Sequence, residues 1–273
     1  MKLSVLKNAV EGTTTYYVGD DIEHIKHLSN CTLITKKKFD GLDNVEQIIT
    51  ENPQLYFYKL SHEVPNEYTF DGNYTIGNNC NIHTSVVIGD NVVIGDGVTI
   101  GPNTVVYSKT SISDNTSIGA NVTIGASGMM WVWDRNTRVF LKQLGGVYIG
   151  ENSIIGSNSV IVRGSANEVT TINQNVNMAP GCCIGHGTYV EENVHFANNI
   201  TIGGSVYISS NNFLSGGCII NPGVQIKSQN VVIGAGCVVN NDINTTGVYV
   251  GVPAKKIKDV EDNMKGIPKW GNI

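Results

Sequence analysis

The sequence repeats a pattern of six residues from residue 76 onward. A branched aliphatic residue occupies every sixth position, and the first nine follow one another without a break. These nine are Ile76, Ile82, Ile88, Ile94, Ile100, Val106, Ile112, Ile118 and Ile124. Neither a helical period of 3.6 residues nor a simple strand alternation gives this spacing. We therefore predict a short strand and a tight turn in every six residues.

The repeat resumes after each of two interruptions, at 149–161 and again at 172–239. Glycine follows most of the aliphatic residues, and we expect it to ease the turn. A single hexad cannot bury its own aliphatic side chain, so successive turns must stack around one continuous core. The aliphatic residues are therefore predicted to point inward.

The repeat resembles that of the hexapeptide-repeat family, whose members fold as left-handed parallel β-helices. In that family three hexads form one triangular coil of 18 residues. The resemblance implies that the roughly 24 hexads of this chain form about eight coils, stacked at the ~4.8 Å spacing of neighbouring strands.

Residues 1–72 lack the repeat. The runs 32–35 and 47–50 read as strands, and turn-forming residues at 65–66 and 71–73 indicate a junction. We expect a mainly β chain with a small mixed α/β domain over 1–72. The β-helix is predicted over 73–254, including a loop over 126–148, and a short C-terminal tail over 255–273.

The two interruptions are candidate binding loops, because loops projecting from a rigid solenoid commonly carry function. Residues 126–148 are rich in aromatic and basic side chains, among them Trp131, Trp133 and Arg138. The shorter interruption, 162–171, includes Arg163 and Glu168. The long loop is expected to contact substrate, a neighbouring subunit, or both.

The composition excludes several functional classes. Charged residues are 15% of the 273, and 18 basic against 23 acidic residues give a net charge of −5. This balance argues against nucleic-acid binding. No stretch approaches the ~18–20 apolar residues that span a bilayer, and Lys7 interrupts the start before a signal-peptide core forms. Six cysteines without a CxxC pair favour neither a zinc ribbon nor a disulfide scaffold. We expect a cytoplasmic protein without metal or membrane partner.

Several segments resemble motifs of the lipid A N-acyltransferases, which acylate UDP-3-O-acylglucosamine. They occur in the same order and at nearly the same spacing over the whole chain. These segments are Asn52–Lys59, Ile124–Gly128, Lys142–Gly145, Arg163–Gly164, Ile184–His186 and Ile202–Ser205. Gly251–Lys255 resembles the terminal GxPA motif of hexapeptide sugar acyltransferases in general.

His186 is the candidate general base. It lies outside the inward row, two residues after Ile184, so we expect it to project from the prism surface. An amine must lose a proton during acyl transfer, and an imidazole with an ordinary pKa of ~6.5 suits that task at neutral pH. Gly204 lies one 18-residue coil farther on, where its N–H is available to a thioester oxyanion. The resemblance implies the same two roles.

Other candidate residues divide between acceptor and donor. The acceptor-binding candidates are Met129, Trp131, Gln143, Tyr16, Tyr17 and Tyr56. The tyrosines either stack on a nucleotide base or fill the small core. The donor-binding candidates are Lys227, Lys255 and Lys256. These lysines either hold the phosphates of acyl-CoA or form a solvated end of the prism.

The resemblance implies a homotrimeric N-acyltransferase that moves an acyl group from acyl-CoA to the amine of a nucleotide-linked sugar. A dTDP-4-amino-4,6-dideoxyglucose of an anthrose or O-antigen type pathway is our expected acceptor. The alternative is a lipid A N-acyltransferase that uses acyl carrier protein. Two departures argue against it: Asn221–Gly223 replaces the AGH motif, and only a short tail follows Ala254.

Two rivals come from other classes. A zinc hydratase of the γ-carbonic anhydrase type requires three histidines per zinc, two of them five residues apart, and no histidine pair of this sequence has that spacing. A non-catalytic β-helix scaffold would need neither the long loop nor a histidine placed one coil before a glycine.

Overall fold

A computed structural model describes residues 2–42, 44–65 and 69–261, which form two compact units. Unit 1 comprises Met1–Asn66, Ser127–Gly145 and Gly164–Glu168. Unit 2 comprises Glu67–Ala126, Gly146–Arg163 and Val169–Ile273. Most of the loop expected within the β-helix domain therefore belongs to unit 1, and so do residues 164–168 of the shorter interruption.

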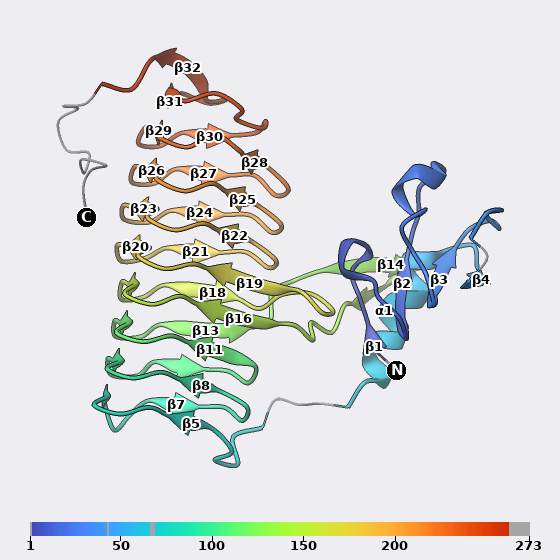
Figure 1. The fold of residues 1–273 in the computed structure, drawn as a ribbon, viewed down its shortest axis with the longest axis horizontal. Coiled ribbons are helices and arrows are strands. Elements are labelled where there is room, and N and C mark those ends of the chain that lie inside the picture. The colour runs from blue at the N-terminus through green and yellow to red at the C-terminus, as the bar shows by residue number, and fades with distance from the viewer. Residues whose placement is uncertain (1, 43, 66–68, 262–273) are drawn as a thin grey trace. The chain divides into compact units, whose positions relative to one another are not determined.

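Unit 2 is a stack of short parallel strands that form three faces, visited in the order 1, 2, 3 in every coil (Figure 1). Face 1 contains β5 (Thr75–Ile76), β8 (Val93–Ile94), β11 (Thr110–Ile112), β16 (Gly146–Ile149), β19 (Val169–Ile172), β22 (Tyr189–Val190), β25 (Tyr207–Ile208) and β28 (Gln225–Ile226). Face 3 contains β7 (Val87–Ile88), β10 (Val105–Val106), β13 (Thr123–Ala126), β18 (Val160–Val162), β21 (Cys183–Ile184), β24 (Thr201–Ile202), β27 (Ile219–Ile220) and β30 (Val238–Val239).

Face 2 has two more strands than the others, because the last two close the end of the stack. It contains β6 (Asn81–Ile82), β9 (Thr99–Ile100), β12 (Ser117–Ile118), β17 (Ile154–Ile155), β20 (Asn177–Met178), β23 (His195–Phe196), β26 (Phe213–Leu214), β29 (Val231–Ile233), β31 (Gly247–Val250) and β32 (Lys255–Lys258). β32 runs antiparallel to β31, so the predicted tail begins as a strand. Residues 262–273 of that tail lie outside the described residues.

The predicted inward row forms the core of unit 2. Ile94, Ile100 and Val106 are at most 2% exposed, and they belong to one cluster that continues to Ile243 and Tyr249. Ile76 is 44% exposed, because it lies in the first coil, with a neighbouring coil on one side only. The stacking that the six-residue period predicts is therefore confirmed.

The turns of the prism depend on asparagine more than on glycine. Thirteen of the sixteen non-glycine residues with left-handed φ in the described part of the chain are asparagines, such as Asn79 (φ 55°). Gly77 follows the aliphatic residue but lacks a left-handed φ; a Cβ there would lie 2.5 Å from the carbonyl carbon of Gly95 in the next coil. Our expectation that such glycines ease the turn was wrong except at Gly125, whose φ is 81°: the others permit close packing between coils.

Unit 1 is built on a parallel sheet with one α-helix. The sheet contains β1 (Lys2–Leu3), β2 (Thr13–Tyr16), β3 (Cys31–Thr35) and β4 (Val45–Ile49). Two short 3-10 helices, η1 (Leu6–Asn8) and η2 (Ile22–His24), lie between its strands. The helix α1 (Pro53–Glu63) begins at Asn52, whose side chain accepts a hydrogen bond from the Leu55 amide. The expected small mixed α/β domain is confirmed.

The long loop folds as an antiparallel hairpin of β14 (Trp131–Asp134) and β15 (Thr137–Phe140). Leu141 and Ala166 share one buried cluster with Leu3, Ile34 and Phe57. This shared core is why residues 127–145 and 164–168 of the two interruptions belong to unit 1. No helix in the described part of the chain is long and apolar enough to cross a membrane.

Candidate active site at one edge of the prism

His186 and both interruptions of the repeat share one edge of the prism, which we call edge 3–1 because the chain passes there from face 3 to face 1. The loop after β13 and the loop after β18 leave from this edge, and β21 ends on it just before His186. Ile161 pairs with Ile184, so Arg163 occupies in its coil the position that His186 occupies in the next.

The imidazole of His186 lies against Gly204. Cys183 and Ile184 pair with Thr201 and Ile202, which brings residue 204 under residue 186, as the 18-residue spacing predicts. A Cβ atom at residue 204 would lie 2.6 Å from Cδ2 and 2.7 Å from Cε1 of His186, and closer still to Nε2. Only glycine therefore accommodates the half-buried imidazole in this position.

The backbone amide of Gly204 borders the same site. A Cβ atom at Gly185 would lie 2.5 Å from the Gly204 nitrogen. Because residue 185 is glycine, no side chain of that residue packs against the amide. Among the residues that the structure describes, no hydrogen-bond acceptor faces the Gly204 N–H. Pro222, one coil farther on, has no side-chain acceptor to offer. The edge therefore presents an imidazole and a backbone donor side by side.

The backbone around His186 is held by the coils before and after it. The Gly187 amide donates to Thr170 Oγ1 at 2.9 Å, and Thr188 Oγ1 donates to the Gly203 carbonyl at 3.0 Å. The Ser205 amide donates to the His186 carbonyl at 2.7 Å. Both threonines are fully buried. This arrangement fixes the turn that carries the imidazole.

Arg163 is a fully buried residue that ties neighbouring coils together. Its Nε donates to the Gly125 carbonyl at 2.5 Å and its Nη2 donates to the Ser108 carbonyl at 2.8 Å. The sequence analysis placed Arg163 in the shorter interruption, whereas the structure includes it in unit 2, at the end of a coil. Its guanidinium supports edge 3–1 from within.

The predicted acceptor residues of the long loop lie in unit 1. Met129 is 74% exposed and Trp131 is 39% exposed. Gln143 is buried, and its Oε1 accepts the Gly128 amide at 2.5 Å, while its Nε2 has no partner among the described residues. Gln143 thus holds the base of the hairpin through the Gly128 amide.

The three predicted tyrosines differ in their surroundings. The Tyr16 ring packs 4.9 Å from that of Phe57, and burial, together with the neighbouring Tyr58, raises the pKa of Tyr16 to about 12. The Tyr17 hydroxyl donates to the Asp21 carbonyl at 2.9 Å. Both rings therefore serve the small core, the second of the two readings given above. Tyr56 on α1 is 39% exposed.

The predicted donor lysines lie toward the C-terminal end of unit 2. Lys256 Nζ lies 2.7 Å from an Asp259 carboxylate oxygen, and Lys227 Nζ lies 3.9 Å from one of Asp242. Lys255 is exposed on β32. Two of the three charges are thus already compensated in part.

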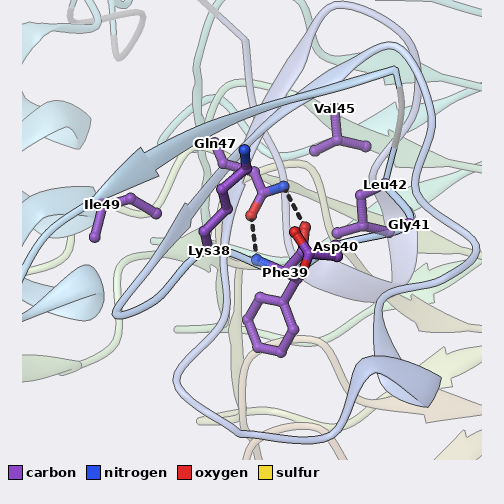
Figure 2. A pocket seen from close by; sticks show the side chains of 8 residues that line it. All are labelled: Lys38, Phe39, Asp40, Gly41, Leu42, Val45, Gln47 and Ile49. Atoms are coloured by element: carbon purple, nitrogen blue, oxygen red, sulfur yellow. Dashed lines mark hydrogen bonds between the residues drawn. The ribbon is translucent and has the colours of Figure 1, made fainter.

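A hollow of about 580 Å³ opens in unit 1 between the segment after β3 and strand β4. The Gln47 side chain closes one wall, because its amide exchanges two hydrogen bonds of 2.8 Å with the Phe39 backbone (Figure 2). None of the residues predicted to bind substrate lines it. The described residues contain no group of three His, Cys, Asp or Glu side chains suited to a metal ion.

Comparisons with known proteins agree with this architecture. Residues 73–108 and 91–126 match the family model described as bacterial transferase hexapeptide (six repeats). No curated protein matches the sequence. The UDP-N-acetylglucosamine acyltransferase LpxA of Bacteroides fragilis is 22% identical, with 71% of this chain and 73% of that one covered and a TM-score of 0.62.

The UDP-N-acetylglucosamine acyltransferase of Campylobacter jejuni is similar to the same extent. It is 21% identical over 71% of this chain and 73% of its own, with a TM-score of 0.60. At these identities the likeness establishes the fold and leaves the substrate open. The chain therefore has the predicted left-handed parallel β-helix fold, with repeats of the bacterial transferase hexapeptide type over residues 73–126.

Proposed function

We propose that the protein is an N-acyltransferase that moves an acyl group from acyl-CoA to the amine of a nucleotide-linked amino sugar. The observation that carries this proposal is the imidazole of His186 held against Gly204 on edge 3–1. A base and a backbone donor at one surface are the two groups that acyl transfer requires. The structural similarity to two UDP-N-acetylglucosamine acyltransferases supports a nucleotide-sugar acceptor.

Each group has one task in the reaction. The amine nitrogen attacks the thioester carbonyl carbon while His186 removes a proton from that nitrogen. The carbonyl oxygen takes up the negative charge and accepts a hydrogen bond from the Gly204 N–H. The C–S bond then breaks, the amide carbonyl forms again, and the departing thiolate takes the proton from the imidazolium.

We place the proposed contacts of the two substrates in different parts of the chain. Met129, Trp131, Gln143 and Tyr56 in unit 1 are the proposed contacts of the acceptor, for which a dTDP-linked 4-amino-4,6-dideoxy sugar is our choice. Lys255 on β32 is the best placed of the three lysines to meet a donor phosphate, since Lys227 and Lys256 pair with aspartates. We propose a homotrimer, in which each edge 3–1 faces a neighbouring prism.

Release of free coenzyme A thiol tests the activity. The full chain is mixed with acetyl-CoA or a longer acyl-CoA and with a panel of nucleotide-linked sugars that carry an amine or a hydroxyl at the same carbon. Thiol release with the amines alone is the expected result. Release with the hydroxyl sugars would identify an O-acyltransferase, and release only with acyl carrier protein as donor would favour the lipid A alternative. No turnover with any pair of donor and acceptor would favour the alternative of a non-catalytic β-helix scaffold.

A further inference from the structure

The hairpin β14–β15 holds most of the tryptophan and arginine of the molecule. Two of the three tryptophans and two of the three arginines of the chain lie within 131–138. Trp131 pairs with Phe140 and Trp133 pairs with Arg138 across the two strands, so these four side chains share one face. We call this the outer face. Trp131, Trp133 and Phe140 are 39%, 52% and 43% exposed, and Arg138 is exposed as well.

The opposite face of the hairpin is packed into unit 1. Val132 and Val139 contact the buried cluster around Phe57. Lys59 of α1 forms an ion pair of 2.6 Å with Asp134, and the Phe140 carbonyl lies 2.7 Å from Nε2 of His62. The hairpin is therefore a fixed platform, so its exposed aromatic side chains are held in defined positions.

The outer face combines flat aromatic rings with a positive charge. The Trp131 and Trp133 rings meet edge to face, with centroids 5.1 Å apart at 81°. The Arg138 guanidinium carbon lies 5.7 Å and 5.9 Å from the two ring centroids, so the cation is held over both indoles. Asp134 is the only acidic residue of the hairpin, and Lys59 already pairs with it. Arg135 and Arg138 leave this surface positive.

We propose that the outer face binds the nucleoside diphosphate part of the acceptor. The base stacks on an exposed indole, and the diphosphate oxygens accept hydrogen bonds from the Arg138 guanidinium. A nucleoside diphosphate is a flat π system joined to two anionic groups, which complements two indoles and an arginine fork. This inference rests on the proposed function, and it moves the base-stacking site from the predicted tyrosines of the small domain to the hairpin.

Binding to the full-length protein, measured without any acyl donor, tests the inference. UDP and dTDP are titrated by calorimetry, with uridine and inorganic pyrophosphate as probes of the base and of the anion alone. Arg138→Gln is expected to raise the Kd for the diphosphates roughly 10-fold and to leave uridine unaffected, because charge-assisted hydrogen bonds to phosphate are lost. Arg138→Lys should lose less, and Trp133→Leu should weaken both the diphosphates and uridine.

Two controls separate binding from folding and from catalysis. Phe70→Leu removes an equally exposed aromatic ring (46%) outside unit 1 and should bind as the parent does. His186→Ala should also bind normally. Normal binding without any transfer by the parent protein would refute the proposed function and leave this inference standing.

Several results would overturn the inference. An unchanged Kd in both Arg138→Gln and Trp133→Leu would do so, provided that thermal unfolding shows intact folding. Loss of binding in Tyr56→Leu alone would place the base on α1. A Kd raised for coenzyme A but not for UDP or dTDP would assign the outer face to the donor. Dissociation of an oligomer in Trp133→Leu, with nucleotide binding unchanged, would make it a subunit contact.

Discussion

Two edges of the same prism differ in whether a side chain of the next coil accepts the hydrogen bond of the turn amide. On the edge between faces 1 and 2, which we call edge 1–2, the Asn78 amide donates to an Asp96 carboxylate oxygen at 2.5 Å. The Asp96 amide in turn donates to Asp114 at 2.8 Å. Each amide is thus capped by the side chain one coil farther on. On edge 3–1 the residue in the capping position for His186 is Gly204, and the residue in that position for Gly204 is Pro222.

The backbone of the two edges is the same, so the difference lies in the side chains. The next residue of the turn has a left-handed φ on both edges, 55° at Asn79 and 58° at Ser205. The turn conformation therefore permits a capping side chain on either edge. At residue 204 the imidazole of His186 already fills the space that such a side chain would need. On edge 1–2 carboxylates cap the turn amides, whereas on edge 3–1 Gly204 makes room for the imidazole of His186, and Pro222 leaves the Gly204 N–H without a side-chain cap.

Gly204→Ala is expected to have the largest effect of the substitutions that probe this contrast. The added Cβ would displace the imidazole from its position, and turnover should fall roughly 10²–10⁴-fold, as for loss of a general base. Gly216→Ala is the matched control, because it has the same place in its turn and its Cβ would meet only the Asn198 carbonyl, at 3.4 Å. Initial rates of thiol release measure both. Equal rates for the two variants would show that the His186–Gly204 contact is irrelevant to transfer.

Pro222→Asp would place on edge 3–1 a carboxylate in the position that Asp96 occupies on edge 1–2. The carboxylate should accept the Gly204 N–H as Asp96 accepts that of Asn78, and so remove the oxyanion donor without touching His186. We expect kcat to fall roughly 10²-fold, since that is the usual cost of losing one such donor. Pro222→Ala should retain activity. If Pro222→Asp is as active as Pro222→Ala, the Gly204 amide has no part in the reaction.

The reverse change, Asp96→Ala, removes a cap from edge 1–2. The Asn78 amide loses its acceptor, and the free energy of unfolding in urea should fall by about 1 kcal/mol. Thiol release should be unchanged. A fall in turnover comparable to that of Pro222→Asp would mean that the two edges are not functionally distinct.

The smallest expected effect is on the pH dependence of stability, and it concerns Asp90, on edge 3–1 in an early coil. Hydrogen bonds from the Thr69 hydroxyl and then from the Asn73 amide hold the pKa of the Asp90 carboxyl below its ordinary value. A depressed pKa stabilises the folded state above the ordinary carboxyl pKa of ~3.9, and this contribution is lost as the pH falls through the folded value. Asp90→Asn should therefore flatten the decline of the unfolding midpoint below about pH 4. An identical decline in the variant would exclude this carboxylate as a cause.

The sequence predicts much of unit 2, because the six-residue period follows from one requirement, the burial of the aliphatic side chains between coils. Every inward aliphatic must meet its equivalent in the next coil, so the row from Ile94 onward follows from spacing alone. The role of glycine was not predictable in this way, since close approach of Gly77 to Gly95 depends on the distance between coils. The abundance of asparagine was visible, and it is explained by the left-handed turn positions.

The candidate site was predictable only in part. The 18-residue spacing placed Gly204 beside His186, and the structure adds that the ring itself requires glycine. The burial of Arg163 was missed, because the sequence does not show at which residue the coil ends and the interruption begins. The hairpin was missed as a structural element, although Trp131, Val132 and Trp133 alternate with the period of a strand.

The central claim is that His186 removes the proton of the acceptor amine. The most direct test is kcat for His186→Ala, with the most active pair of acyl-CoA and amino sugar, at a pH where the parent enzyme is fully active. We predict a fall of roughly 10²–10⁴-fold with an unchanged thermal unfolding midpoint, because the substitution removes the proposed proton acceptor. A variant that folds and turns over at the parent rate would contradict the account, and would leave the departing thiolate to accept the amine proton.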